Sequence, residues 1–134
     1  MTRFWITLDQ ATNFVLDSFN LMKGGEIFVP KIPSIKIVNL MKAIDPRVKF
    51  KNIGIRPGEK IHELMCPADS AYSTIEFKKF FIISPSTFEN GQNINSYMNY
   101  FGEKGKKVKE GFEYRSDTNK YFLKSDEIKK LLKK

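Results

Sequence analysis

Apolar positions in the first half of the chain follow two periods, one helical and one extended. The helical period predicts a helix that begins after a capping box of Thr7 and Gln10 and ends before Gly24-Gly25; its apolar face comprises Leu8, Ala11, Val15, Phe19 and Met22. A second amphipathic helix is predicted over residues 35–44, with Ser34 as its cap. Extended segments are predicted at residues 1–6, 26–29 and 48–55.

The sequence IGIRPGEKIHE, at residues 53–63, lies between that last strand and a helix predicted over residues 58–65. Pro57 disfavours a helical conformation for Arg56 and suits the first position of the helix that follows. Glu59 then falls in the first helical turn, near the Arg56 guanidinium. Such a pair suits a ligand with an anionic part and a hydroxyl-rich part. The alternative is a surface salt bridge whose carboxylate is favoured by the helix dipole.

The pattern is weaker after Pro67. It predicts a buried strand at residues 80–83, an exposed Asn-rich loop at 87–100 and a short extended segment at 112–114. A final helix is predicted from Ser125, with Ile128, Leu131 and Leu132 on its inner face. The order of helices and strands indicates the α/β class. The strands of the first half are too few for an independent sheet, so the chain is expected to rest on another part.

Composition narrows the class of protein. A length of 134 residues and 41% hydrophobic content fit one small folded region. The net charge is +8, and residues 103–134 contribute 11 Lys/Arg against 6 Asp/Glu, but no nucleic-acid recognition motif accompanies them. Cys66 is the single cysteine, which excludes an internal disulfide. With no membrane-length apolar run and no signal peptide, the expected location is the cytoplasm, without nucleic-acid or membrane partners.

No reaction centre is evident in the sequence. Gly24-Gly25 precedes a strand, whereas a dinucleotide-binding turn follows one. The one histidine, His62, is expected to be structural, and no metal-ligand cluster accompanies it. Tyr100 and Lys104 have the spacing of a proton-abstracting pair, but Gly102 argues against the helix that this pair needs. Catalytic, cofactor-binding and metal residues are therefore not expected in this chain.

Several motifs together carry a family resemblance: MTRFWIT, GGEIFVPKIPS, GIRPGEKIHELM, TIEF, EKGKKVKEGFEY and EIKKL. They resemble the C-terminal part of the inverting UDP-N-acetylglucosamine 4,6-dehydratases, which are extended short-chain dehydrogenase/reductases of the polysaccharide-biosynthesis group. The similarity covers nearly the whole chain, and residues 87–100 match least well. The implied fold is the α/β substrate-binding portion of such an enzyme without its Rossmann domain. Residues 1–134 would form one region, with the UDP-binding residues in 1–67 and an irregular extension ending in a helix in 68–134.

The resemblance also implies a function. In these lyases NADP takes hydride from C4 of UDP-N-acetylglucosamine, water is lost across C5 and C6, and C5 is epimerised, which begins pseudaminic acid synthesis for flagellin glycosylation. The NADP site and the catalytic residues would belong to the missing Rossmann domain. Its absence would reflect a frameshift, a divided gene or a chosen segment of a longer protein. Whether this chain alone is an enzyme is left open, and full-length relatives are expected to form homo-oligomers.

The same resemblance assigns three site residues. Arg3 and Arg56 match the arginines that approach the UDP diphosphate, and two guanidinium groups suit a diphosphate because each offers several fixed donors. Glu59 matches the glutamate expected to accept hydrogen bonds from the ribose hydroxyls. The alternative is a non-catalytic basic module that binds anionic surfaces or nucleic acid. An upstream Rossmann-domain sequence would favour the dehydratase.

Overall fold

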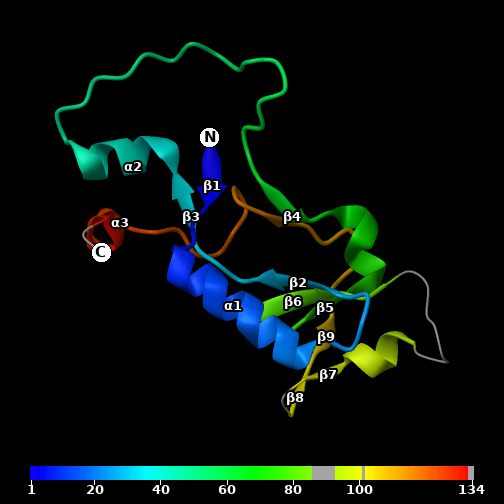
Figure 1. Ribbon diagram of the computed structural model, residues 1–134. Coiled ribbons are helices and arrows are strands. Elements are labelled where there is room, and N and C mark those ends of the chain that lie inside the picture. The colour runs from blue at the N-terminus through cyan, green and yellow to red at the C-terminus, as the bar shows by residue number, and fades with distance from the viewer. Residues whose placement is uncertain (86–92, 101, 133–134) are drawn as a thin grey trace. The chain divides into compact units, whose positions relative to one another are not determined.

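The computed structural model describes residues 1–85, 93–100 and 102–132. The chain folds as two compact units whose segments interleave in the sequence (Figure 1). The site unit comprises Met1–Thr7, Ile32–Leu64 and Arg115–Lys134, and the sheet unit comprises Leu8–Lys31 and Met65–Tyr114. Both units therefore take residues from before and after position 67.

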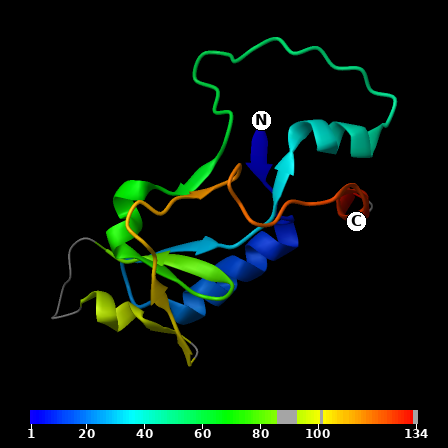
Figure 2. The same ribbon diagram turned by 180° about the vertical axis from the view of Figure 1, so that it is seen from behind.

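The sheet unit is built on a four-stranded antiparallel sheet in the order β2-β6-β5-β9. Its strands are β2 (Ile27–Pro30), β5 (Thr74–Glu76), β6 (Phe80–Ile83) and β9 (Lys106–Lys107). Helix α1 (Leu8–Leu21) lies along one face of this sheet, in front of it in Figure 1 and behind it in Figure 2. The smaller elements are η1 (Ala68–Ser73), η2 (Ile94–Tyr97) and the paired strands β7 (Asn99–Tyr100) and β8 (Glu103–Lys104).

The core of the sheet unit is rich in aromatic residues. Buried members are Ile75, Phe77, Ile82, Tyr97 and Tyr100. Gly105 passes directly over this core, because a Cβ placed on it would lie 2.5 Å from Cγ2 of Ile75 and 2.6 Å from Cζ of Phe77. A glycine is therefore required at this position by close packing. By contrast α1 has no buried residue, and Leu8 and Phe19 are 82% and 65% exposed.

The site unit is a pair of helices beside a two-stranded sheet. Strand β1 (Thr2–Phe4) pairs antiparallel with β3 (Ser34–Lys36), with Arg3 opposite Ile35. Helices α2 (Ile37–Ile44) and α3 (Ser125–Leu132) pack together around Ile35, Ala43, Leu123 and Ile128. Two further strands, β4 (Leu64–Cys66) and β10 (Tyr114–Arg115), pair with each other.

The elements with strong local periodicity are confirmed. Helices α1, α2 and α3 and strands β1, β2 and β6 lie within two residues of their predicted bounds. Ser34, however, is not a helix cap: it is a fully buried residue of β3, and Lys36 is the residue before α2. Tyr100 lies in β7 and Lys104 in β8, which agrees with the expectation that these two residues do not share a helix.

Two predictions around the RPGE sequence are wrong. Residues 48–55 form no strand and residues 58–65 form no helix; the chain is irregular from 45 to 63 apart from turns (Figure 1). Gly54 and Gly58 adopt φ values of +81° and +77°, which neither a strand nor a right-handed helix accommodates. The alternation of apolar and polar residues at 48–55 predicted a strand, but no neighbouring strand of the described chain pairs with these residues in the structure.

The Asn-rich stretch is also more ordered than predicted. Residues 87–92 lie outside the described part of the chain, but residues 93–100 form η2 and β7 instead of an exposed loop. Tyr97 and Tyr100 are buried there because their rings complete the core of the sheet unit. Within the described residues, no helix is long and apolar enough to cross a membrane.

Candidate functional site

Arg56 and Glu59 are brought together by a turn centred on Pro57 and Gly58. The Glu59 N–H donates to the Arg56 carbonyl oxygen at 3.0 Å. In return, Oε2 of Glu59 accepts from the Arg56 backbone N–H at 3.2 Å. The carboxylate thus bonds the main chain of Arg56, and the Arg56 side chain extends into solvent. The turn therefore places the Glu59 carboxylate against the main chain of Arg56, and no helix follows it.

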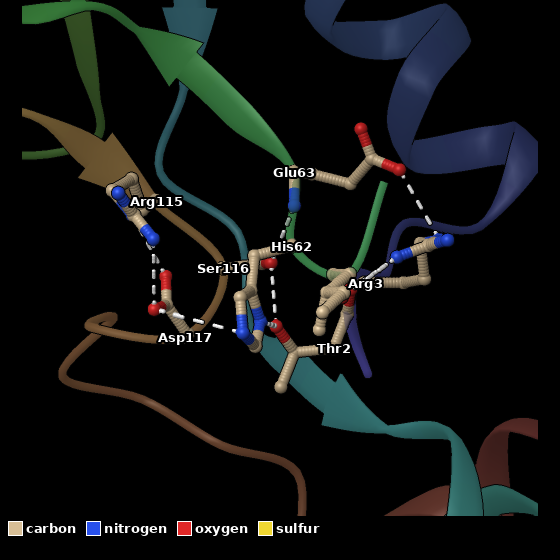
Figure 3. Close-up of polar contacts among 8 residues, drawn as sticks. Thr2, Arg3, His62, Glu63, Arg115, Ser116 and Asp117 are labelled. Carbon is tan, nitrogen blue, oxygen red and sulfur yellow. Dashed lines mark hydrogen bonds and ion pairs between the residues drawn. The ribbon is translucent and has the colours of Figure 1, made fainter. Parts of the chain in front are cut away.

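Arg3 of β1 is fastened to the end of the same loop (Figure 3). Its Nη1 donates to the carbonyl oxygens of Thr2 at 2.7 Å and Ile61 at 3.2 Å, and its Nη2 donates to that of Lys60 at 2.8 Å. Its Nε lies 3.1 Å from Oε1 of Glu63. The Thr2 N–H adds a bond of 2.9 Å to the Ile61 carbonyl. The Arg3 guanidinium therefore holds a fixed position beside the loop that carries Arg56 and Glu59.

A chain of buried hydroxyls fixes the other side of this loop (Figure 3). The Glu63 N–H donates to Oγ of Ser116 at 2.8 Å, and Oγ of Ser116 lies 2.7 Å from Oγ1 of Thr2. Oγ1 of Thr2 lies 2.8 Å from Nδ1 of His62. Ser116, Thr2 and His62 are thus joined in one continuous chain of hydrogen bonds.

Asp117 faces the opposite nitrogen of His62. Its Oδ2 lies 3.9 Å from Nε2, and its two oxygens accept from Nε and Nη2 of Arg115 at 3.0 and 3.1 Å. These hydrogen bonds from Arg115 lower the pKa of the Asp117 carboxyl below its ordinary value, with a smaller contribution from His62. A carboxylate thus lies on the side of the His62 ring opposite the hydroxyl chain.

The structure therefore associates all three predicted residues, Arg3, Arg56 and Glu59, with one loop. Sequence reasoning missed the residues that hold it: Thr2, Glu63, Ser116 and Asp117. Ser116 and Asp117 lie more than fifty positions from the loop, and no local period or motif connects them to it. Among the described residues, no cluster of His, Cys, Asp and Glu is arranged to hold a metal ion.

A family model described as "Polysaccharide biosynthesis protein" matches residues 1–85, which include β1 and the whole loop. The chain belongs to the polysaccharide biosynthesis protein family. The resemblance drawn from the motifs MTRFWIT and GIRPGEKIHELM is thereby confirmed at the level of the family.

Individual proteins are similar to this chain along almost its whole length. A UDP-N-acetylglucosamine 4,6-dehydratase (inverting) of Campylobacter jejuni subsp. jejuni serotype O:23/36 is 49% identical over 128 residues, which is 96% of this chain and 38% of the relative. A UDP-glucose 4-epimerase of Rickettsia canadensis is 33% identical over 98% of this chain and 38% of the relative. The chain thus spans about two fifths of the length of these relatives.

A solved structure supports the fold assignment. The X-ray structure of Pen from Bacillus thuringiensis matches with a TM-score of 0.75 and 29% identity, over 98% of this chain and 38% of that one. Together with the mixed helices and strands, this match confirms the predicted α/β class, the C-terminal portion of a short-chain dehydrogenase/reductase.

Proposed function

We propose that this chain is the nucleotide-binding portion of an inverting UDP-N-acetylglucosamine 4,6-dehydratase and that its loop at residues 56–63 binds UDP. The observation that carries the proposal is the attachment of Arg3 to the carbonyl oxygens of Lys60 and Ile61, which ties a second guanidinium to the loop that holds Arg56 and Glu59. The 49% identity to the Campylobacter dehydratase over 128 residues supports the choice of substrate class.

The proposed roles follow from the donors and acceptors of each side chain. Arg56 and Arg3 would donate to the diphosphate oxygens, since a guanidinium stays charged and presents its donors in a planar fork. Glu59 would accept hydrogen bonds from the two ribose hydroxyls, because a carboxylate offers two acceptor oxygens. The exposed Arg56 side chain is available to a ligand in the present conformation.

NADP does not fit the residues described here. Its pyrophosphate needs a glycine-rich turn between a strand and a helix. In this chain Gly24 and Gly25 follow α1 and precede β2, which is the reverse order. We therefore assign this chain no hydride-transfer step. In our proposal the cofactor and the catalytic residues belong to a Rossmann domain. The protein that combines this domain with the present chain is then a homo-oligomer in the cytoplasm. Its product is used for pseudaminic acid synthesis and flagellin glycosylation.

Calorimetric titration of the chain with UDP tests the proposal. Arg56→Ala should weaken UDP binding by about 1.5–3 kcal/mol, the range for a hydrogen bond to a charged group. Arg56→Lys should restore part of this loss because a point charge does not reproduce the planar fork. Glu59→Gln should weaken binding by roughly 1 kcal/mol, because one acceptor oxygen becomes a donor.

The control is a double substitution of exposed lysines on α3, Lys129→Ala with Lys130→Ala. It should leave UDP affinity nearly unchanged, because exposed charges are screened beyond about 8–10 Å. If the control loses affinity while Arg56→Ala does not, the ligand site lies elsewhere, and the chain behaves as a basic module for anionic surfaces.

A further inference from the structure

Arg3 pairs with a carboxylate that the UDP proposal does not use. Nε of Arg3 lies 3.1 Å from Oε1 of Glu63, and their side chains are 28% and 39% exposed. The other contacts of the guanidinium are with the carbonyl oxygens of Thr2, Lys60 and Ile61. These oxygens position the guanidinium without carrying a formal charge, whereas Glu63 neutralises it.

We propose that Glu63 is an internal competitor for Arg3 and that its carboxylate occupies the position that a phosphate group of the ligand takes. The inference rests on the proposed function, because it requires Arg3 to face the diphosphate. Carboxylate and phosphate oxygens accept the same hydrogen bonds from a guanidinium. An ion pair exposed to this degree is weak and exchanges readily, and a diphosphate offers more charge and more oxygens than one carboxylate.

The surrounding contacts allow this exchange to occur without rearrangement of the main chain (Figure 3). The backbone of Glu63 is held on both sides by Ser116, since its N–H donates to Oγ and its carbonyl oxygen accepts from the Ser116 N–H at 2.9 Å. Arg3 is held by the backbone carbonyls. Only the side chain of Glu63 has to rotate away, so this residue sets the affinity of a site that is otherwise already formed.

The test is a substitution that removes the charge and keeps the shape. Glu63→Gln retains an oxygen that can accept from Nε of Arg3. It should tighten UDP binding by roughly two- to fivefold, the scale of a partly exposed ion pair. It should leave the affinity for uridine unchanged, because uridine carries no phosphate. The matched control is Glu110→Gln, the same change of charge at an exposed position of the sheet unit; it should change neither affinity.

Combining the substitution with a change at Arg3 gives a second readout. In an Arg3→Lys or Arg3→Met background, whichever retains the wild-type melting transition, Glu63→Gln should increase UDP affinity less than it does beside Arg3. A decrease in UDP affinity for Glu63→Gln would mean that Glu63 orients Arg3 for the ligand, and equal changes for UDP and uridine would mean a general structural effect. Either result overturns the inference.

Failure of the inference can be told apart from failure of the proposed function. Suppose that the wild-type chain binds UDP, that Arg56→Ala weakens this binding, and that Glu63→Gln binds UDP with the wild-type affinity. The competitor role of Glu63 alone is then wrong. If neither the wild-type chain nor Glu63→Gln binds UDP, the proposed function is wrong, and the competitor role of Glu63, which depends on it, is wrong as well.

Discussion

Oγ1 of Thr2 lies 2.8 Å from Nδ1 of His62, although sixty positions separate the two residues in the chain. Thr2 is only 5% exposed, and its hydroxyl also contacts Oγ of Ser116. One hydroxyl group therefore connects the first strand, the loop that carries Arg56 and Glu59, and the residues that follow β10. The pair agrees with the expectation that His62 is a structural residue.

Replacing Thr2 with valine should destabilise the site unit by about 1–3 kcal/mol. Valine keeps the shape of threonine, but it leaves Nδ1 of the half-buried His62 and Oγ of the buried Ser116 without their partner. Urea denaturation measures the free energy of unfolding. Thr118→Val is the matched control, because Thr118 is exposed, and a surface change of this kind stays within about 0.5 kcal/mol. Equal stabilities for the two variants would show that the hydroxyl chain contributes nothing.

Acid should weaken the same unit through Asp117. The hydrogen bonds from Arg115 lower the pKa of this carboxyl in the folded state, so the folded chain binds fewer protons than the unfolded chain near pH 4. The resulting stabilisation is complete above the unfolded-state pKa and is lost as the pH falls through the lowered folded-state pKa. Denaturation of the wild type between pH 7 and pH 2 should show this loss, and Asp117→Asn should reduce the slope.

Asp69→Asn provides the charge-matched comparison for that experiment, because Asp69 is exposed and lies in the sheet unit. A steeper dependence on pH in Asp117→Asn than in Asp69→Asn would contradict the assignment of the acid sensitivity to the Arg115–Asp117 pair.

Gly105→Ala should destabilise the sheet unit by about 1–3 kcal/mol, the range for overpacking a core. The added methyl group would lie 2.5 Å from Ile75 and 2.6 Å from Phe77, and both residues are buried. Gly102→Ala is the control, since a Cβ there meets nothing within 4 Å; its φ of +72° should cost roughly 1 kcal/mol. A larger loss for Gly102→Ala than for Gly105→Ala in chemical denaturation would exclude the packing explanation.

Much of this fold could be predicted because its helices carry their own period. The apolar spacing of residues 8–22 defined α1, and Ser125 with its acidic neighbours defined the start of α3. The strand predicted at 48–55 failed because alternation shows which side chains share a face and not which strand is adjacent. The short strands β5, β7, β8 and β9 are too brief to show a period at all.

The residues of the candidate site also differ in how far the sequence predicts them. Arg56 and Glu59 were predictable because a four-residue sequence contains the turn that joins them. Arg3 depended on resemblance to relatives. Ser116 and Asp117 could not be found from one sequence, since their contacts with Thr2 and His62 are created only by folding. A turn within four residues leaves a pattern in the sequence, whereas a polar network between distant segments leaves no such pattern.

The apolar face of α1 should make the chain associate or bind a hydrophobic dye. Val15, Leu16 and Phe19 are each more than half exposed, and exposed apolar patches of this kind favour association. Phe19→Lys should lower dye fluorescence and light scattering while the helical circular dichroism signal is retained. The control Asn20→Lys adds the same charge at an exposed polar position. A sharp cooperative melt of a wild-type monomer that binds no dye would contradict this expectation.

The interleaving of the two units sets an order of events during synthesis. Both segments of the sheet unit, Leu8–Lys31 and Met65–Tyr114, have been made before Ser116 leaves the ribosome. The site unit needs Arg115–Lys134 as its third piece, so until then Thr2 has no Ser116 hydroxyl to meet. Because nascent chains fold as their segments emerge, the sheet unit can form first. The contacts of Glu63 with Ser116, which hold the end of the loop that carries Arg56 and Glu59, therefore form only after the third piece of the site unit has been made.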